Sequence, residues 1–190
     1  MSKRLNDKVA LITGAAELAL FVKEGAKVIA TDINAKLLNK HVDTLKEQYG
    51  DTILSLKLDV TKEDEWIDAV VQGIKKFKKI DILVNNAGIG ITDKTSGLTD
   101  STVDDWHLFM DTNAMSHFLG MKHVVPEMKK IGGGSIINIS SLASVQGIAG
   151  PHLTRPLRRL PGHLRRERHV TLASTTSVST PSCPAGSLPR

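Results

Sequence analysis

The chain has 190 residues, enough for one domain with its own hydrophobic core, and its apolar and charged fractions are ordinary for a globular protein. No apolar run approaches the roughly 18 residues that cross a membrane, so no membrane partner is expected. A single cysteine, Cys183, excludes an internal disulfide and favours a cytoplasmic location. The seven histidines show no metal-ligand spacing, so we expect no metal site.

The formal net charge of +5 is distributed unevenly along the chain. Residues 1–154 have a net charge of −1, whereas residues 155–190 contain seven arginines and one acidic residue, a net charge of +6. Such asymmetry suggests a nucleic-acid or membrane-surface partner. The basic segment has no aromatic residue that could stack on bases, however, and nucleic acid is therefore not the expected partner.

Apolar runs and helical periodicity alternate along residues 8–139. The predicted strands are residues 8–13, 27–31, 52–58, 81–84 and 135–139. The predicted helices are a short one ending near Gly25, residues 35–49, a helix capped by Thr61 that runs to Phe77, and residues 102–130, with Pro126 kinking or ending the last one. This alternation predicts βαβ units and a doubly wound parallel sheet of about five strands, an α/β fold of Rossmann type.

The sequence DILVNNAGIG, residues 81–90, is central to this pattern. Ile82-Leu83-Val84 has no polar alternation, which is typical of a strand buried on both faces. The strand then stops at turn-forming asparagine and glycine residues. Ligands of open α/β sheets lie beyond the carboxyl ends of the strands, so a candidate site is expected here. From the residues alone, an ordinary turn after a strand is an equal alternative.

The pattern ends after residue 154. Residues 155–190 contain five prolines and no Ile, Phe, Tyr, Trp, Asp or Asn, a composition that predicts disorder. We therefore divide the chain into a partial Rossmann-type domain, residues 1–154, and a disordered basic tail, residues 155–190. In this scheme the fifth strand has an unpaired edge, and Val103, Trp106 and Met110 are exposed on the long helix, both of which predict poor solubility.

Several motifs together resemble the short-chain dehydrogenase/reductase family in its single-domain form. They follow the family's order over residues 5–154: Thr13-Gly14, Asp32, Asp59-Val60, Asn85-Asn86-Ala87-Gly88, Asp111-Thr112-Asn113 and Asn138-Ile139-Ser140-Ser141. The resemblance implies an oxidoreductase that transfers a hydride between NAD(H) and a secondary alcohol or ketone. A homo-oligomer is usual in the family, but parts of the chain that build it are missing here.

The resemblance also assigns roles to individual residues. Gly14 belongs to the phosphate loop, and a carboxylate at Asp32 would bind the adenosine ribose and repel a 2′-phosphate, which favours NAD over NADP. Asp59 and Val60 would line the adenine pocket, and the remaining cofactor contacts would be Asn86, Ala87 and Gly88 near the nicotinamide side. In catalysis, Ser141 would bind the substrate oxygen and Asn113 would hold a water of the proton relay.

Two departures from the family predict that this chain is inactive. The family's catalytic tyrosine, with a lysine four residues later, should follow Ser141, but the only tyrosine is Tyr49 and the last lysine is Lys130. The family's Gly-x-x-x-Gly-x-Gly loop keeps only Gly14, with Leu18 and Leu20 at the later spacings, as a deletion of five or six residues would produce. Pyrophosphate binding should therefore be badly weakened.

Three hypotheses remain open from the sequence. In the first, the chain descends from an NAD-dependent enzyme. In the second, it is a non-catalytic Rossmann-fold remnant. In the third, it is a catalytically inactive domain whose basic tail binds nucleic acid. The tail is either translated out of frame or a genuine phosphate-binding segment. A serine hydrolase is not expected, because the chain has no G-x-S-x-G motif and no base is placed near Ser141.

Overall fold

The structure, a computed structural model, describes residues 3–90, 101–141 and 173–179. The strands are β1 Val9–Thr13, β2 Lys27–Asp32, β3 Ile53–Lys57, β4 Ile82–Asn85, β5 Gly133–Ile139 and β6 Ala173–Ser179. The helices are α1 Leu18–Lys23, α2 Ala35–Tyr49, α3 Glu63–Phe77, α4 Val103–Met110 and α5 Ser116–Lys130, with a π-helical turn, Asp111–Met115, between the last two. In the described ranges, no helix has the length and hydropathy needed to span a bilayer.

The strands form one sheet in the order β3-β2-β1-β4-β5-β6. The first five are parallel, with Val9 opposite Lys27, Ala10 opposite Ile82, and Ile82 opposite Ser135. The order reverses direction at β1, whose two neighbours come from different halves of the domain. The predicted parallel α/β sheet of Rossmann type is therefore confirmed.

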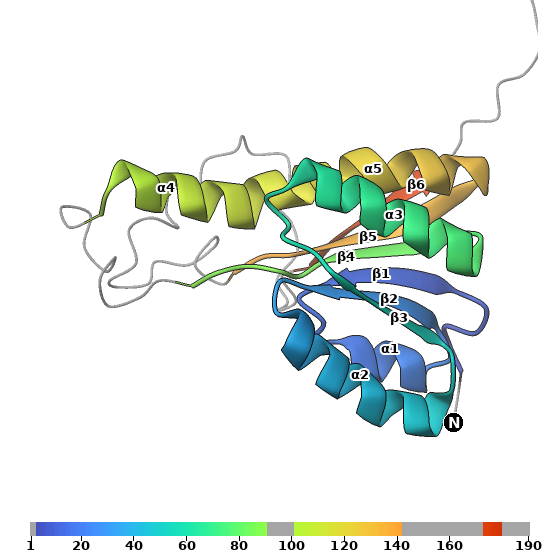
Figure 1. Cartoon of the computed structure of the whole chain (residues 1–190). Coiled ribbons are helices and arrows are strands. Elements are labelled where there is room, and N and C mark those ends of the chain that lie inside the picture. Colours follow the sequence, from blue (N-terminus) through green and yellow to red (C-terminus); the bar gives the residue numbers. More distant parts are fainter. Residues whose placement is uncertain (1–2, 91–100, 142–172, 180–190) are drawn as a thin grey trace, which may run out of the picture.

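Helices cover both faces of the sheet (Figure 1), with α3 and α5 on one face and α1 and α2 on the other. Alternate residues of β1 join different cores: Val9 and Leu11 pack with Trp66 of α3, whereas Ala10 and Ile12 pack with Leu18 of α1. All five residues of β1 and all four of β4 are buried. The continuous apolar runs of these strands therefore reflect burial on both faces.

The sixth strand differs from the sequence-based expectation. Ala173–Ser179 lies antiparallel to β5, with Gly133 opposite Ser179 and Ile139 opposite Ala173. The prediction that β5 has an unpaired edge is therefore wrong. Pairing through backbone hydrogen bonds requires no large apolar side chain, which is why composition did not reveal this strand. The rest of residues 155–190 lies outside the described ranges.

The predicted long helix is divided into α4, the π-helical turn and α5, and α5 continues through Pro126 to Lys130. Of the three residues expected to be exposed, Val103 is 71% exposed, whereas Trp106 and Met110 are half-buried. Leu108 of α4 and Phe118 of α5 are also exposed, each by 54%.

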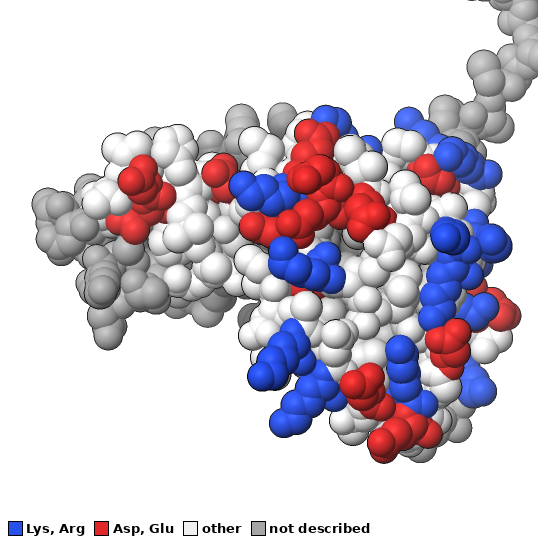
Figure 2. Space-filling view, in the orientation of Figure 1, with Lys and Arg blue, Asp and Glu red and all other residues white. Residues whose placement is uncertain are grey.

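The charged residues at the two ends of α3 stabilise its helix dipole. Glu63, Asp64 and Glu65 occupy its first turn and Lys75 and Lys76 its last, and Figure 2 shows acidic side chains gathered around the start of this helix. Glu63 also accepts hydrogen bonds from Lys122 at 2.6 Å and from His123 at 2.9 Å, both on α5. These contacts fix α5 beside α3, above the ends of the strands that form the candidate site.

Candidate functional site

A hollow of about 310 Å³ opens at the carboxyl edge of the parallel strands. It is formed by the ends of β1 and β2, the loops after β3 and β4, and α4 with the π-helical turn. Its lining residues are Gly14, Asp32, Ile33, Leu58, Asp59, Val60, Thr61, Ala87, Gly88, Ile89, Leu108 and Thr112. Six of the nine residues singled out from the sequence line it: Gly14, Asp32, Asp59, Val60, Ala87 and Gly88.

Gly14 forms the floor of this hollow at the end of β1. Its backbone has φ +71°, and its N–H donates to the Thr31 carbonyl at 2.8 Å. A Cβ atom at this position would lie 3.1 Å from the Ala87 Cα and 3.1 Å from the Asn86 Nδ2. Glycine is therefore required here both by the backbone conformation and by the close approach of the loop after β4.

Asp32 ends β2 and is held by the turn into α2. Its Oδ1 accepts a hydrogen bond from the Asn34 N–H at 2.8 Å, and Asn34 in turn caps α2 by accepting from the Leu37 N–H at 3.0 Å. The carboxylate is half-buried. The cap thus orients Asp32 at the rim, where a ligand hydroxyl could reach it.

Asp59 and Val60 follow β3. The Asp59 Oδ1 accepts from the Thr61 hydroxyl at 2.7 Å and from the Thr61 N–H at 3.0 Å. Although partial burial disfavours the charged form, these hydrogen bonds and the nearby Lys62 and Lys57 hold the pKa of Asp59 below its ordinary value. The Val60 carbonyl accepts from the Trp66 Nε1 at 3.0 Å. The hollow therefore contains an ionised carboxylate beside an apolar wall.

The role expected for Thr61 was wrong. Its hydroxyl donates to Asp59, and α3 begins at Glu63 with no side-chain hydrogen bond to its first turn. The carboxylate two residues earlier is the stronger acceptor for this hydroxyl. The three acidic residues in the first turn stabilise the start of α3 in its place.

Asn86 holds the loop after β4 in place together with Thr13, a motif residue to which the sequence analysis assigned no role. The Asn86 Nδ2 donates to the Thr13 carbonyl at 3.1 Å and to the Gly14 carbonyl at 3.2 Å. The Thr13 Oγ1 accepts from the Asn86 N–H at 3.1 Å and from the Ala87 N–H at 3.0 Å. This reciprocal arrangement fixes the loop after β4 against the end of β1.

Asn113 lies in the π-helical turn and contacts the same loop. Its Oδ1 accepts from the Ile89 N–H at 2.8 Å and its Nδ2 donates to the Ile89 carbonyl at 3.1 Å. A Cβ atom on Gly88 would lie 3.0 Å from the Asn113 Oδ1, so the glycine makes room for this contact. π-Helical turns are frequent at functional sites, and here the turn directs Asn113 to the backbone of Ile89 in the loop after β4.

Ser141 is not among the residues that line the hollow. It is exposed and is the last described residue of its range, after β5. The segment in which the family's tyrosine and lysine would follow, near residues 154–156, lies outside the described residues.

The turn from Gly14 to α1 differs from a dinucleotide phosphate loop in its hydrogen bonding. The Ala16 N–H donates to the Gly14 carbonyl and the Leu18 N–H to the Ala15 carbonyl. Glu17 stands at the N-cap of α1 without a side-chain capping bond, and its Oε2 is buried with no hydrogen-bond partner among the described residues. The residues present fit the adenosine part of a dinucleotide through Asp32 and Asp59, but they do not fit its pyrophosphate.

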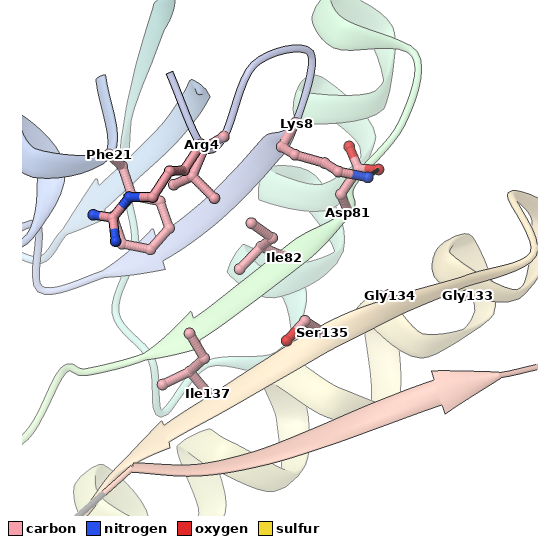
Figure 3. A pocket seen from close by; sticks show the side chains of 10 residues that line it. Arg4, Lys8, Phe21, Asp81, Ile82, Gly133, Gly134, Ser135 and Ile137 are labelled. Atoms are coloured by element: carbon pink, nitrogen blue, oxygen red, sulfur yellow. Dashed lines mark ion pairs between the residues drawn. The ribbon is translucent and has the colours of Figure 1, made fainter. Parts of the chain in front are cut away.

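A second hollow, of about 450 Å³, lies at the opposite edge of the sheet (Figure 3). Ile82 and Ile137 form part of its apolar wall, and the Lys8 side chain points to Asp81, with the Lys8 Nζ 3.5 Å from the Asp81 Oδ1. Asp81 is already bonded to Lys79 and to the Val9 N–H. In the described part of the chain, no cluster of His, Cys, Asp and Glu is suited to a metal ion.

Comparison with known proteins identifies the fold and the motifs. The family model for short chain dehydrogenase matches residues 8–152. A 2,5-dichloro-2,5-cyclohexadiene-1,4-diol dehydrogenase from Sphingobium indicum is 36% identical over 156 residues, which cover 79% of this chain and 61% of that protein. A cyclopentanol dehydrogenase from Comamonas testosteroni is 37% identical over 153 residues, covering 77% of this chain and 60% of that protein.

Two solved structures have the same arrangement of elements. An L-sorbose reductase from Gluconobacter frateurii, complexed with NADPH and L-sorbose, matches with a TM-score of 0.74 and 29% identity, covering 83% of this chain and 61% of that one. A short chain dehydrogenase/reductase from Burkholderia phymatum in complex with NAD matches with a TM-score of 0.75 and 23% identity, covering 82% of this chain and 56% of that one. The chain thus spans about three fifths of the length of the curated relatives it matches.

Proposed function

Because the chain belongs to the short-chain dehydrogenase/reductase family, we propose that it is the cofactor-binding part of an oxidoreductase acting on a secondary alcohol or ketone with NAD(H). One observation supports this most directly. Gly14, Asp32 and Asp59, which follow three different strands, line a single hollow at the carboxyl edge of the sheet. This is the place at which doubly wound sheets bind dinucleotides.

The choice of NAD over NADP rests on Asp32. Its carboxylate would accept hydrogen bonds from the ribose hydroxyls, whereas a 2′-phosphate would place a second negative charge beside it. Relatives of similar fold have been solved with NAD or with NADPH, so the fold does not decide between the two cofactors. Val60 and Leu58 would supply the apolar wall for the adenine, with Ala87 and Gly88 nearer the nicotinamide.

We propose further that this chain does not catalyse turnover on its own. Ser141 could bind a substrate oxygen, and Asn113 could hold a water close to it. The sequence has no tyrosine after Tyr49 and no lysine after Lys130, so the family's general acid and the cation that lowers its pKa are both missing. The substrate class carried over from the relatives is a small alcohol, and its identity within that class is open.

Ligand binding to the full chain tests the proposal. Isothermal titration with adenosine should give saturable binding that Asp32→Ala abolishes, while Asp43→Ala, which removes an exposed carboxylate of α2, should leave it unchanged. Cyclopentanol with NAD should give no turnover. A cooperatively folded sample that binds neither adenosine nor NADH would refute the cofactor role and favour a non-catalytic remnant. Measurable turnover would refute the proposed inactivity.

A further inference from the structure

We propose that the hollow binds a neutral adenine nucleoside with a free 5′-hydroxyl more tightly than the same nucleoside carrying 5′-phosphates. This inference rests on the proposed function, because it assumes that adenosine lies over Asp32 with its 5′ carbon toward the Gly14–Leu18 turn. The phosphates of a dinucleotide are attached at that carbon. The turn, and not the adenosine pocket, therefore decides how the ligand's 5′ group is received.

The backbone of the turn has few amides to offer an anion. Phosphate binding in this fold depends on several N–H groups at a helix N-terminus that point toward the ligand. Here the Ala16 and Leu18 N–H groups donate to carbonyls of the turn itself. The helix that follows has only six residues. Two amides at the start of the helix are therefore engaged within the turn and are not available to a pyrophosphate.

Glu17 adds a negative charge at the start of α1, where a bound phosphate would require a positive one. A carboxylate at the N-cap is stabilised by the helix dipole, so the chain supplies its own anion at the start of α1. Its Oε2 is buried and accepts no hydrogen bond from any described residue. Because this oxygen is buried and Glu17 does not line the hollow, the residue acts on a ligand only through its charge, which opposes that of a 5′-phosphate.

The lining of the hollow is also negatively charged. Two of its lining residues, Asp32 and Asp59, are acidic, and its described lining contains no lysine or arginine. The pKa of Asp59 is held low, so this carboxylate is ionised at neutral pH. A diphosphate would therefore enter a hollow whose lining has two negative side chains and no lysine or arginine, the nearby Lys57 and Lys62 lying beside Asp59, and this favours the uncharged ligand.

The experiment is calorimetric titration of the full chain with adenosine and ADP. Adenosine should bind about tenfold more tightly than ADP at low salt, and the gap should narrow as salt is added. The Glu17→Gln variant should strengthen ADP binding about tenfold, because one like charge is removed. Glu47→Gln, at an exposed position on α2, is the matched control and should change neither affinity.

The outcomes separate this inference from the function on which it rests. If ADP binds as tightly as adenosine, or more tightly, the inference is wrong while the cofactor role stands. If ADP is weaker but Glu17→Gln does not strengthen it, the assignment to Glu17 is wrong. If a cooperatively folded sample binds no adenosine at all, the proposed function fails as well.

Discussion

Gly14 lies so close to the loop after β4 that replacing it with alanine should lower the stability of the domain by a predictable amount. In Gly14→Ala, the new Cβ would lie 3.1 Å from the Ala87 Cα and 3.1 Å from the Asn86 Nδ2, and the backbone φ of +71° would remain. The left-handed conformation costs an alanine about 1–2 kcal/mol. Crowding against backbone adds about 1–3 kcal/mol. We therefore expect the free energy of unfolding to fall by about 2–5 kcal/mol.

Gly132→Ala is the matched control for this substitution. Gly132 also has a positive φ, +87°, but a Cβ atom there would meet nothing within 4 Å. In this variant the free energy of unfolding should fall only by the cost of placing an alanine in the left-handed conformation, about 1–2 kcal/mol. Urea unfolding followed by tryptophan fluorescence measures both, since Trp66 is fully buried. Equal losses in the two variants would show that the contact with Ala87 does not matter and that the support described for the hollow is wrong.

Three further predictions concern α5 and the turn before it. Asn113→Ala removes both hydrogen bonds to Ile89 and should cost about 1–2 kcal/mol, with faster amide exchange at Ile89 as the direct readout. Burial lowers the pKa of His117 from its ordinary value of 6.5, so the unfolded chain binds the extra proton first and stability should fall as pH drops through 6.5. His117→Gln should weaken that pH dependence in urea titrations, and the same substitution at exposed His107 should not. Phe118→Glu removes an apolar side chain that is 54% exposed, so the soluble fraction on expression should rise; an unchanged fraction would count against this face as the cause of poor solubility.

The sequence was sufficient for the five parallel strands and for most of the hollow. Apolar runs such as Ile82-Leu83-Val84 predict buried strands because they are short and are bounded by turn-forming residues. Thr13 was quoted as part of a motif, but its role was missed because one hydroxyl at a strand end has no periodic signal. Only its two hydrogen bonds to the loop after β4 reveal that role. The strand at Ala173–Ser179 was missed because composition weighs side-chain burial, whereas its pairing is made through the backbone.

Motif order predicted residues that the fold brings together, but it did not predict their partners. The resemblance placed Asn113 near the site, yet nothing in the sequence showed that both its polar atoms bond to Ile89. The buried oxygen of Glu17 was equally hidden, since a glutamate at the start of a helix is ordinary in sequence. Such details depend on the shortened turn after Gly14, whose backbone no motif describes.

The position of β1 at the centre of the parallel strands determines how the domain can assemble. Val9 pairs with Lys27, a short distance along the chain, whereas Ala10 pairs with Ile82, which is synthesised much later. One edge of β1 must therefore stay open while α2, β3 and α3 are made, and long-range pairing of this kind is slow. An open edge on a strand as apolar as VALIT invites association with other nascent chains. The yield of folded protein thus depends on how quickly β4 reaches β1 during translation.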